Sequence, residues 1–498
     1  MKDITLSTQF RFTGFDNQGE VFIDREGIYR GIYVEHAETI KTIHRLFSAK
    51  KLERFGIVKT ELINKNPYKD LNFAFLLKHE KIPFISYPHE WSASMFKDAA
   101  LFHLKLFKNL FRYQLTLKDW HPYNILFKST EPIFTDFTSM IPVAGLTEQD
   151  YLTQIHINSP LQKIWDPYSK YYYAMHQMMY LSNFLLPLYL FQQRKYQKAR
   201  SLMIGKGLHI GQRQILPTDV FNKLDLASIK FKFFEITKQI ALIDKNPEKQ
   251  MFFNLLKKEI DDLSISLKRS NYTDYYEAKK ENLKFEPNPG WNNKQKVIFN
   301  FLKDSKPKTL IDIGSNTGWY SILAAKNGCQ VIAIDTDEAC IDQLYITSKE
   351  SKLAILPLVM DIMNPTPEIS AKSYKKPKAT QIKHHLPLFL KAENRYKCDV
   401  VLALGLLHHL VLGLGFSFAD IIEILSKFSN KYLIVEFVGI DDKLIKNEPD
   451  FFPKYNVYPE RFSWYTRQNF QKALKKHFER VTVQPSHPDS RFIFICEK

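Results

Sequence analysis

Residues 309–328 read "TLIDIGSNTGWYSILAAKNG", and this stretch decides how the C-terminal part of the chain folds. The apolar run at 309–313 predicts a strand, and Trp319 begins a segment with an apolar face at helical spacing. Gly314 and Gly318 bracket the turn between them. A side chain at either glycine would keep the backbone away from a ligand. The stretch therefore predicts a strand, a ligand-binding loop and a helix.

Three acids accompany this loop. Asp312 precedes it, Asp335 ends the next apolar run ("VIAID"), and Asp361 follows a third ("LVMD"). The G-x-x-x-G spacing differs from the G-x-G-x-x-G of dinucleotide folds, so no pyrophosphate cradle is expected. An acid at the end of the second strand can accept both ribose hydroxyls of an adenosine-type ligand, and Asp361 is placed to meet an adenine edge. This order suits S-adenosylmethionine, whose sulfonium and ammonium groups are cationic.

Further apolar runs alternate with helical patterns over the rest of this region. They read "QVIAID", "AILPLVM", "VVLAL" and "YLIVEFV", and the chain closes with "RVTVQ" and "RFIFICE" around a turn. Alternating strands and helices are typical of a parallel sheet wound with helices on both faces, and the last two runs predict an antiparallel hairpin at its edge. The fold class is therefore α/β, with a doubly wound, Rossmann-like sheet of seven strands. The alternative is a similar sheet that binds another ligand.

The acceptor of a methyl group is expected outside the carboxyl end of the fourth strand. That end reads "LALGLLHHLVLG" and contains His408 and His409, while Glu436 ends the fifth strand. Methyl transfer needs alignment of the acceptor, and a hydroxyl acceptor also benefits from a base such as imidazole. These three residues are the catalytic candidates, although a strand-capping histidine and a structural glutamate remain alternatives. The Asn- or Asp-Pro-Pro-aromatic motif of base methylases is absent, so nucleic acid is not an expected partner.

Another motif stands far upstream, in "LKDWHPYNILF" at 117–127. Asp119, Asn124 and Asp136 keep the order and nearly the spacing of a kinase base and its two metal-binding residues. No glycine-rich phosphate loop and no strand lysine paired with a helix glutamate can be recognised. Three interpretations stay open: a kinase-like shell that has kept a structural or substrate-binding role, an active phosphotransferase, and chance similarity.

Bulk properties limit the remaining choices. A chain of 498 residues is too long for one core, and its four cysteines show no zinc or redox spacing. Together with the lack of a signal peptide, this predicts a cytoplasmic protein without a structural metal. The most hydrophobic stretch, 171–191, contains His, Gln, Asn and Pro, so a buried helical hairpin is expected instead of a membrane span. The net charge of +17 is spread along the chain, which favours a solubility role over an anionic partner.

Segments along nearly the whole chain resemble a bacterial family of class I S-adenosylmethionine-dependent methyltransferases that includes a rhizobial host-specific nodulation protein. They include "LKDWHPYNILF", "PIFTDFTSM", "LIDIGSNTGWYSILAAKNG", "VIAIDTDE" and "LALGLLHHL". The resemblance implies methyltransferase activity but does not fix the acceptor, which the family leaves open or assigns loosely to glycans or small metabolites. The expected cofactor-binding residues are Asp312, Gly314, Ser315, Asn316, Gly318, Asp335, Thr336 and Asp361. Small residues follow the Asp of "LKD" in the family, whereas Trp120 and His121 stand here.

The sequence thus predicts three regions: an α+β kinase-like domain at 1–145, a mostly helical region at 146–285 and a methyltransferase domain at 286–498. Pro287, Pro289 and Gly290 punctuate the boundary before the last of these. The predicted function is methyl transfer from S-adenosylmethionine to a small-molecule, glycan or lipid-linked acceptor that the N-terminal region binds or orients. The alternative is a bifunctional enzyme whose kinase-like domain also transfers phosphate from ATP. The sequence does not predict an oligomeric state.

Overall fold

The structure is a computed structural model. It describes residues 11–12, 18–23, 27–64, 72–142, 180–207, 251–265, 269–270, 272–278, 281–367, 369–370, 387–447 and 449–498.

A seven-stranded sheet forms the centre of the C-terminal unit, with the strand order β12-β11-β10-β15-β16-β18-β17. The first five strands are parallel, and β18 pairs antiparallel with both β16 and β17. This confirms the predicted strands and the hairpin at the edge of the sheet. The strands are β10 (Thr309–Ile313), β11 (Gln330–Asp335), β12 (Ile355–Val359), β15 (Cys398–Ala403), β16 (Ser429–Val438), β17 (Arg480–Pro485) and β18 (Arg491–Glu497).

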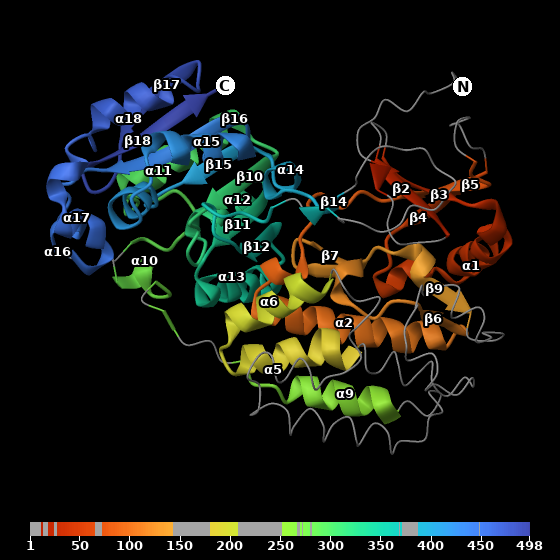
Figure 1. Cartoon of the computed structure of the whole chain (residues 1–498). Coiled ribbons are helices and arrows are strands. Elements are labelled where there is room, and N and C mark those ends of the chain that lie inside the picture. The colour runs from red at the N-terminus through yellow and green to blue at the C-terminus, as the bar shows by residue number, and fades with distance from the viewer. Residues whose placement is uncertain are drawn as a thin grey trace.

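Helices cover both faces of this sheet, so the doubly wound class is confirmed (Figure 1). α11 and α12 pack on one face, and α15 and α18 pack on the other. Because the parallel strands are buried from both sides, they read as nearly continuous apolar runs. The helices are α11 (Asn293–Ser305), α12 (Trp319–Lys326), α13 (Glu338–Glu350), α14 (Ala392–Arg395), α15 (Phe418–Phe428), α16 (Lys443–Asn447), α17 (Pro453–Val457) and α18 (Arg467–Leu474).

The N-terminal unit begins with a five-stranded sheet of order β1-β2-β3-β5-β4. All its pairings are antiparallel, and α1 (Ala37–Lys50) connects β3 to β4. The stretch "GEVFIDREGIYRGIYV" at 19–34 contains β2 and β3. The bounds are β1 (Arg11–Phe12), β2 (Gly19–Ile23), β3 (Ile28–Ile32), β4 (Thr60–Ile63) and β5 (Phe75–His79).

A long buried helix, α2 (Ala93–Phe111), follows this sheet. Its apolar residues recur at helical spacing, and the Ser92 hydroxyl accepts a bond from the Met95 amide to cap its start. Two small antiparallel pairs then carry the "LKDWHPYNILF" and "TDF" segments on their connections. They are β6 (Leu115–Leu117) with β9 (Met140–Pro142), and β7 (Ile125–Lys128) with β8 (Glu131–Phe134).

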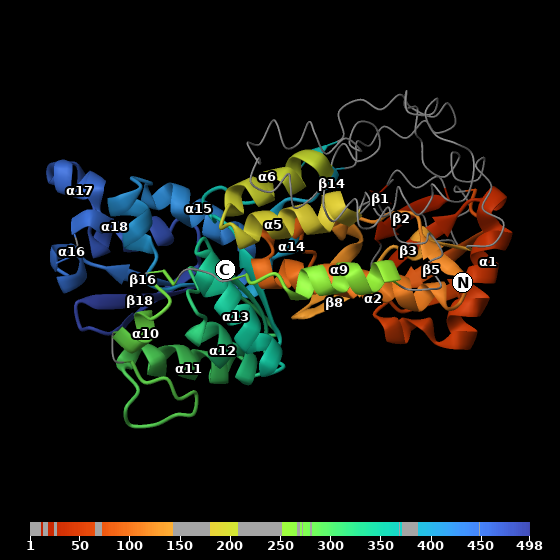
Figure 2. The same cartoon turned by 90° about the horizontal axis from the view of Figure 1, so that it is seen from below.

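Most described helices of the middle region pack along α2 (Figure 2). They are a π-helical turn (Leu181–Leu185), α5 (Leu186–Gln192), α6 (Tyr196–Gly207) and α9 (Met251–Asp261). The short α10 (Tyr275–Ala278) instead lies beside α11 of the C-terminal unit. The rest of the predicted helical region (146–179, 208–250, 266–268, 271 and 279–280) lies outside the described residues. Among the described helices, none is both long and apolar enough to span a bilayer.

The two units share one hydrophobic core, because apolar side chains of α2 and of the C-terminal sheet belong to a single cluster. At its edge the first amides of α2 donate to α13, from Ala93 to Glu338 (3.0 Å) and from Ser94 to Asp342 (2.8 Å). The last residue of α14, Arg395, forms a buried ion pair with Glu90 (2.5 Å). The sheet is thereby anchored on the N-terminal unit through both α13 and α14. The remaining short pair is β13 (Ile369–Ser370) with β14 (Pro387–Phe389).

Candidate active site

The glycine loop lies at the carboxyl end of β10, as predicted. Gly314 and Gly318 adopt positive φ values of 74° and 83°, which few residues with a side chain tolerate. A Cβ added at Gly318 would stand 2.5 Å from the Leu344 side chain of α13. The amides of Gly314 and Ser315 donate to the Ile334 carbonyl of β11 (2.8 and 3.1 Å). The loop is therefore folded back onto the neighbouring strand, and its second glycine permits close helix packing.

Asp335 ends β11 beside this loop. Its two carboxylate oxygens accept the amides of Asn316 (2.8 Å) and Asp337 (3.0 Å). Each oxygen still has a lone pair, so the carboxylate fits a ribose with two hydroxyls. Burial raises the pKa of Asp335. The next predicted residue, Thr336, is exposed at the same edge.

Asp312 has a different environment. It is 3% exposed, and its carboxylate accepts a 2.6 Å hydrogen bond from the Ser321 hydroxyl of α12. Burial, reinforced by the nearby Asp335 charge, raises the pKa of Asp312 to about 6. Within the described structure, Asp312 thus links β10 to α12 underneath the loop, and its charge is partly desolvated.

The adenine end of the predicted site is open. Asp361 is exposed just beyond β12, where its side chain accepts the Met363 amide (2.9 Å). The register pairs Asp335 with Val359, so Asp361 stands at the same edge of the sheet, one strand further out. The three acids therefore follow the carboxyl ends of β10, β11 and β12 in the predicted order.

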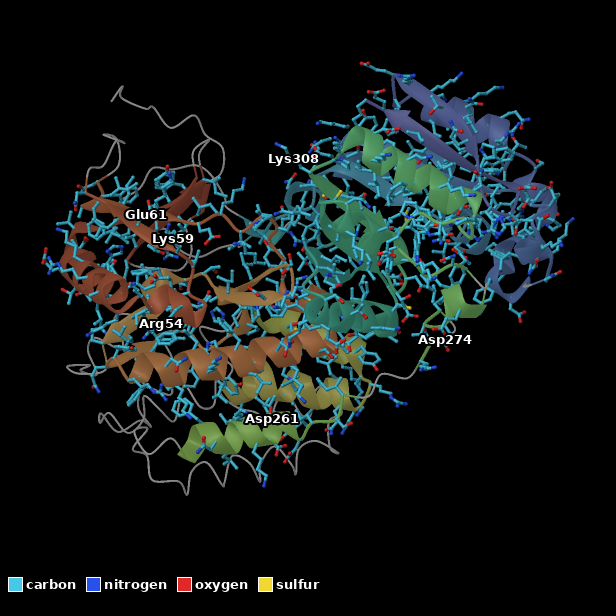
Figure 3. All side chains as sticks on the ribbon, turned by 180° about the vertical axis from the view of Figure 1, so that it is seen from behind. Arg54, Lys59, Glu61, Asp261, Asp274 and Lys308 are labelled. Atoms are coloured by element: carbon cyan, nitrogen blue, oxygen red, sulfur yellow. The ribbon has the colours of Figure 1, made fainter. Side chains whose placement is uncertain are left out.

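The segment before α11, predicted as a domain boundary, contributes to this site. The Asn316 side-chain amide donates to the Tyr272 carbonyl (2.9 Å), which ties this segment to the glycine loop. In Figure 3, Lys308 marks the amino end of β10, and Asp274 marks this segment near the opposite edge of the sheet. The sequence analysis missed this contact, because nothing in a polar connector indicates which loop it will cover.

A buried ion pair joins α11 to β16. Lys294 of α11 donates to Glu436 of β16 (2.8 Å), and the Ser486 hydroxyl donates to the second Glu436 oxygen (2.6 Å). The ring of Tyr320 lies 5.4 Å from the Lys294 ammonium. The Tyr320 hydroxyl and the buried Ser315 hydroxyl have no hydrogen-bond partner among the described residues. These two hydroxyls could bond to a zwitterionic ligand. Such a ligand would lie between the glycine loop, Asp335 and the Lys294–Glu436 ion pair.

The two predicted histidines lie together after β15, with ring centres 4.2 Å apart. His408 is 1% exposed, and burial lowers its pKa well below the usual value. His409 is half-buried, and burial lowers its pKa to about 4. The Phe452 ring lies against His409 at 5.4 Å, and Phe451 lies at 6.1 Å. Both imidazoles are therefore neutral at pH 7, and His409 is the more exposed of the two.

The upstream residues also gather. The Asn124 amide donates to Asp136 (3.4 Å), and Arg30 of β3 forms an ion pair with the other Asp136 oxygen (2.9 Å). Arg30 also donates to the Thr138 hydroxyl (2.5 Å). Asp119 lies, like Asn124, on the connection between β6 and β7, and its backbone amide donates to the Ser139 hydroxyl (3.2 Å). Arg30 was missed by the sequence analysis, although a charged residue inside the apolar run "GIYRGIYV" was a visible signal.

Over the ranges that the structure describes, no three His, Cys, Asp or Glu side chains come together as ligands for a metal ion.

Comparisons with known proteins bear on the C-terminal unit. Residues 292–477 match the family model described as a methyltransferase domain. Nodulation protein NoeA of Rhizobium meliloti (strain 1021) is 23% identical over 468 residues, which are 89% of this chain and 88% of that protein.

Two solved structures resemble parts of the chain. The bifunctional kinase-methyltransferase WbdD is 15% identical, with a TM-score of 0.27 over 40% of this chain and 37% of that one. Magnesium protoporphyrin IX methyltransferase from Synechocystis PCC 6803, with bound SAH, is 14% identical, with a TM-score of 0.27 over 45% of this chain and 97% of that one.

The methyltransferase match covers the glycine loop, Asp335 and the strand ends described above. The prediction of an enzyme that uses S-adenosylmethionine as its cofactor is therefore confirmed.

Proposed function

We propose that this S-adenosylmethionine-dependent methyltransferase modifies a small-molecule, glycan or lipid-linked acceptor bound beside His409. The observation that carries the proposal is the position of a neutral, half-buried imidazole at the carboxyl end of β15, lined by Phe451 and Phe452. In open α/β sheets ligands bind outside the carboxyl ends of the strands. Aromatic walls favour an acceptor with an apolar face, such as a sugar ring or a planar metabolite.

The cofactor, when bound, supplies a methyl group on a cationic sulfur. The residues around His409 would align the acceptor with that methyl group. Alignment is the main contribution of an enzyme to a displacement at carbon. The acceptor oxygen would bond to the methyl carbon as the carbon–sulfur bond breaks and the sulfur leaves as the neutral thioether of S-adenosylhomocysteine. His409 would accept the hydroxyl proton. Its pKa of about 4 keeps the ring neutral at pH 7 but makes it a weak base, so alignment contributes more than proton transfer.

The other two catalytic candidates take different roles in this proposal. His408 is enclosed, and neither ring nitrogen has a hydrogen-bond partner among the described residues. We assign it to the wall behind His409. Glu436 is fully buried and bound by Lys294 and Ser486, so we assign it to holding α11 against β16.

The test uses the full chain and S-adenosylmethionine labelled in its methyl group, incubated with bacterial metabolite and glycolipid fractions. We expect label to enter one acceptor class, and His409→Asn to slow transfer to it by about 10²- to 10⁴-fold. Cofactor affinity, measured by calorimetry, should be unchanged in this variant. The exposed His477→Asn is the matched control. Transfer at the wild-type rate by His409→Asn would refute the proposed base.

We propose a kinase-like N-terminal unit that binds or orients the acceptor, with ATP-dependent phosphotransfer as the second candidate function. Support comes from the strand order β1-β2-β3-β5-β4 with α1 after β3, and from Asn124, Asp136 and Arg30 meeting between the sheet and the later loops. A guanidinium is a good phosphate ligand. Arg30 also neutralises Asp136, so a magnesium ion would have to compete with it.

The two functions of the N-terminal unit differ in their response to nucleotide. Phosphotransfer requires that MgATP at millimolar concentration raises the thermal midpoint, and that Asp136→Ala removes this shift. The exposed Glu131→Ala on β8 is the control. A wild-type protein with no MgATP shift would exclude the phosphotransferase and leave the acceptor-binding role.

A further inference from the structure

The segment before α11 is fixed in place on the methyltransferase unit. The Asn282 carbonyl accepts the Gln295 side-chain amide (2.8 Å), and the Trp291 indole donates to the Lys284 carbonyl (2.8 Å). At its other end the Tyr272 carbonyl is held by Asn316. Glu281 lies between these anchors, and its amide donates to the Tyr276 carbonyl (3.0 Å). Its carboxylate lies close enough to Tyr276, Tyr320 and Lys294 to interact with them electrostatically.

Glu281 has a carboxyl oxygen without a partner. Its Oε2 atom is buried, and among the described residues it has no hydrogen-bond partner. The Tyr320 hydroxyl nearby is also buried and without a partner in the described structure. Burial, with Asp312 and Glu281 close by, raises the pKa of Tyr276 well above its usual value. A buried, unpaired carboxylate oxygen is costly, so its presence points to a cationic ligand.

The protein's own charges do not supply that cation. Lys294 lies near Glu281, but its ammonium donates to Glu436 at 2.8 Å. The Arg491 guanidinium also interacts with Glu436, but it donates to both oxygens of Asp442 (2.8 and 3.0 Å). Both cations near this cluster are therefore bonded to carboxylates other than Glu281.

The strand order sets the direction of the cofactor along the sheet. A ribose at Asp335 on β11 and an adenine toward β12 leave the amino-acid end running toward β10, β15 and β16. Glu281 and Tyr320 lie on that side. We propose that they form the amino-acid subsite, in which the Glu281 carboxylate accepts the α-ammonium and the Tyr320 hydroxyl donates to the α-carboxylate. This proposal rests on S-adenosylmethionine being the cofactor and is independent of the acceptor.

Calorimetry of the full chain with three ligands tests this subsite. S-adenosylmethionine and S-adenosylhomocysteine both carry the ammonium, and only the former carries the sulfonium. 5′-Methylthioadenosine has neither the ammonium nor the carboxylate. We expect Glu281→Gln to weaken the first two by about ten- to a hundredfold and to leave the third unchanged. Tyr320→Phe should show the same selectivity, with a loss of about tenfold.

The matched control is Glu277→Gln on the exposed side of α10, which should bind all three ligands like the wild type. Equal losses for all three ligands in Glu281→Gln would overturn the proposal, because they would show that Glu281 only shapes the site. A loss confined to S-adenosylmethionine would assign Glu281 to the sulfonium and also overturn it. Unchanged binding would overturn it as well. Failure of the wild-type protein to bind S-adenosylhomocysteine would instead contradict the cofactor assignment.

Discussion

Three acidic residues on strands of the C-terminal sheet differ in environment, because Asp312 and Glu436 are buried whereas Asp335 is half-buried. Asp335 uses both oxygens to hold loop amides and keeps lone pairs for a ligand. Asp312 is bonded to Ser321 underneath the loop, and Glu436 is neutralised by Lys294. The partners of each acid therefore distinguish a carboxylate that can still bind a ligand from carboxylates with a structural role. Their positions at strand ends could not make this distinction.

Asp335→Ala should abolish S-adenosylmethionine binding while the protein stays folded. The substitution removes the expected ribose acceptor and also releases the Asn316 amide of the loop. We expect an affinity loss of at least about a hundredfold, since two hydrogen bonds to a charged group are lost. Calorimetry measures it, with the exposed Asp304→Ala of α11 as control and circular dichroism as the test of folding. Unchanged affinity would remove Asp335 from the cofactor site.

Asp312 should make the ligand-free protein less stable above pH 6. Its pKa is about 6 in the fold against 3.8 normally, so the folded state binds the proton more tightly than the unfolded state. Stability from this group is therefore lost as the pH rises from about 4 through 6. The difference of about two units corresponds to about 3 kcal/mol.

The isosteric Asp312→Asn variant tests this directly. It should raise the thermal midpoint of the ligand-free protein at pH 7.5, and the gain should shrink at pH 4.5. Equal gains at both pH values would show that Asp312 does not titrate in this range.

At the scale of elements, the glycine loop is defined by the helices packed around it. The sequence predicted where the turn lies, but the reason for Gly318 is a neighbouring helix: Leu344 of α13 is fully buried against it. Similarly, the segment before α11 belongs to the site because Asn316 and Gln295 anchor it. The glycine loop is thus completed by α13 and by the segment before α11, which are separate from it in the sequence.

Gly318→Ala and Gly328→Ala separate backbone strain from steric clash. Both positions have positive φ, 83° and 90°, so each substitution should cost about 1–2 kcal/mol. Only at Gly318 would the new methyl group meet Leu344; at Gly328 no atom lies within 4 Å. Gly318→Ala should therefore lose a further 1–3 kcal/mol or so and weaken cofactor binding at least about tenfold. Thermal unfolding and calorimetry measure both effects, and identical behaviour of the two variants would argue against the clash.

For the whole molecule, the main feature is a buried polar network between the two units. Glu90 lies in the segment between β5 and α2, and its oxygens accept bonds from Arg395 (2.5 and 2.8 Å), Tyr396 (2.6 Å) and Thr366 (2.6 Å). The Arg395 guanidinium also stacks on the Tyr87 ring (4.2 Å). Together with the shared core, this network fixes the methyltransferase sheet on the N-terminal unit.

Glu90→Gln should destabilise the whole chain. It removes a charge and leaves the Arg395 guanidinium buried without an ionic partner, which costs about 3–5 kcal/mol. The control is Glu80→Gln, whose ion pair with Lys128 is exposed and contributes about 1 kcal/mol or less. Differential scanning calorimetry should show a midpoint lowered by several degrees in Glu90→Gln and almost unchanged in Glu80→Gln. Equal midpoints would mean that the interface does not limit stability.

Much of the C-terminal unit followed from sequence because its rules are local. Strand and helix periods identified all seven strands, and strands that run parallel bring their ends to one edge. The N-terminal strands and α2 were also recognisable from their periodicity. The pairing of Arg30 with Asp136 and of Glu90 with Arg395 was not, because those partners lie more than a hundred residues apart and no spacing rule connects them.

The sequence by itself determined the glycine loop, the positions of Asp312 and Asp335 at the strand ends beside it, and the doubly wound sheet that presents them, because these depend on residues close together in the chain. Only the tertiary structure decided that Glu436 pairs with Lys294, that His408 is buried while His409 is half-buried, and that one Glu281 oxygen is buried without a hydrogen-bond partner among the described residues. The physical reason is desolvation. A side chain's charge, and therefore its chemistry, depends on which distant groups exclude water from it, and that is set only when the chain has packed.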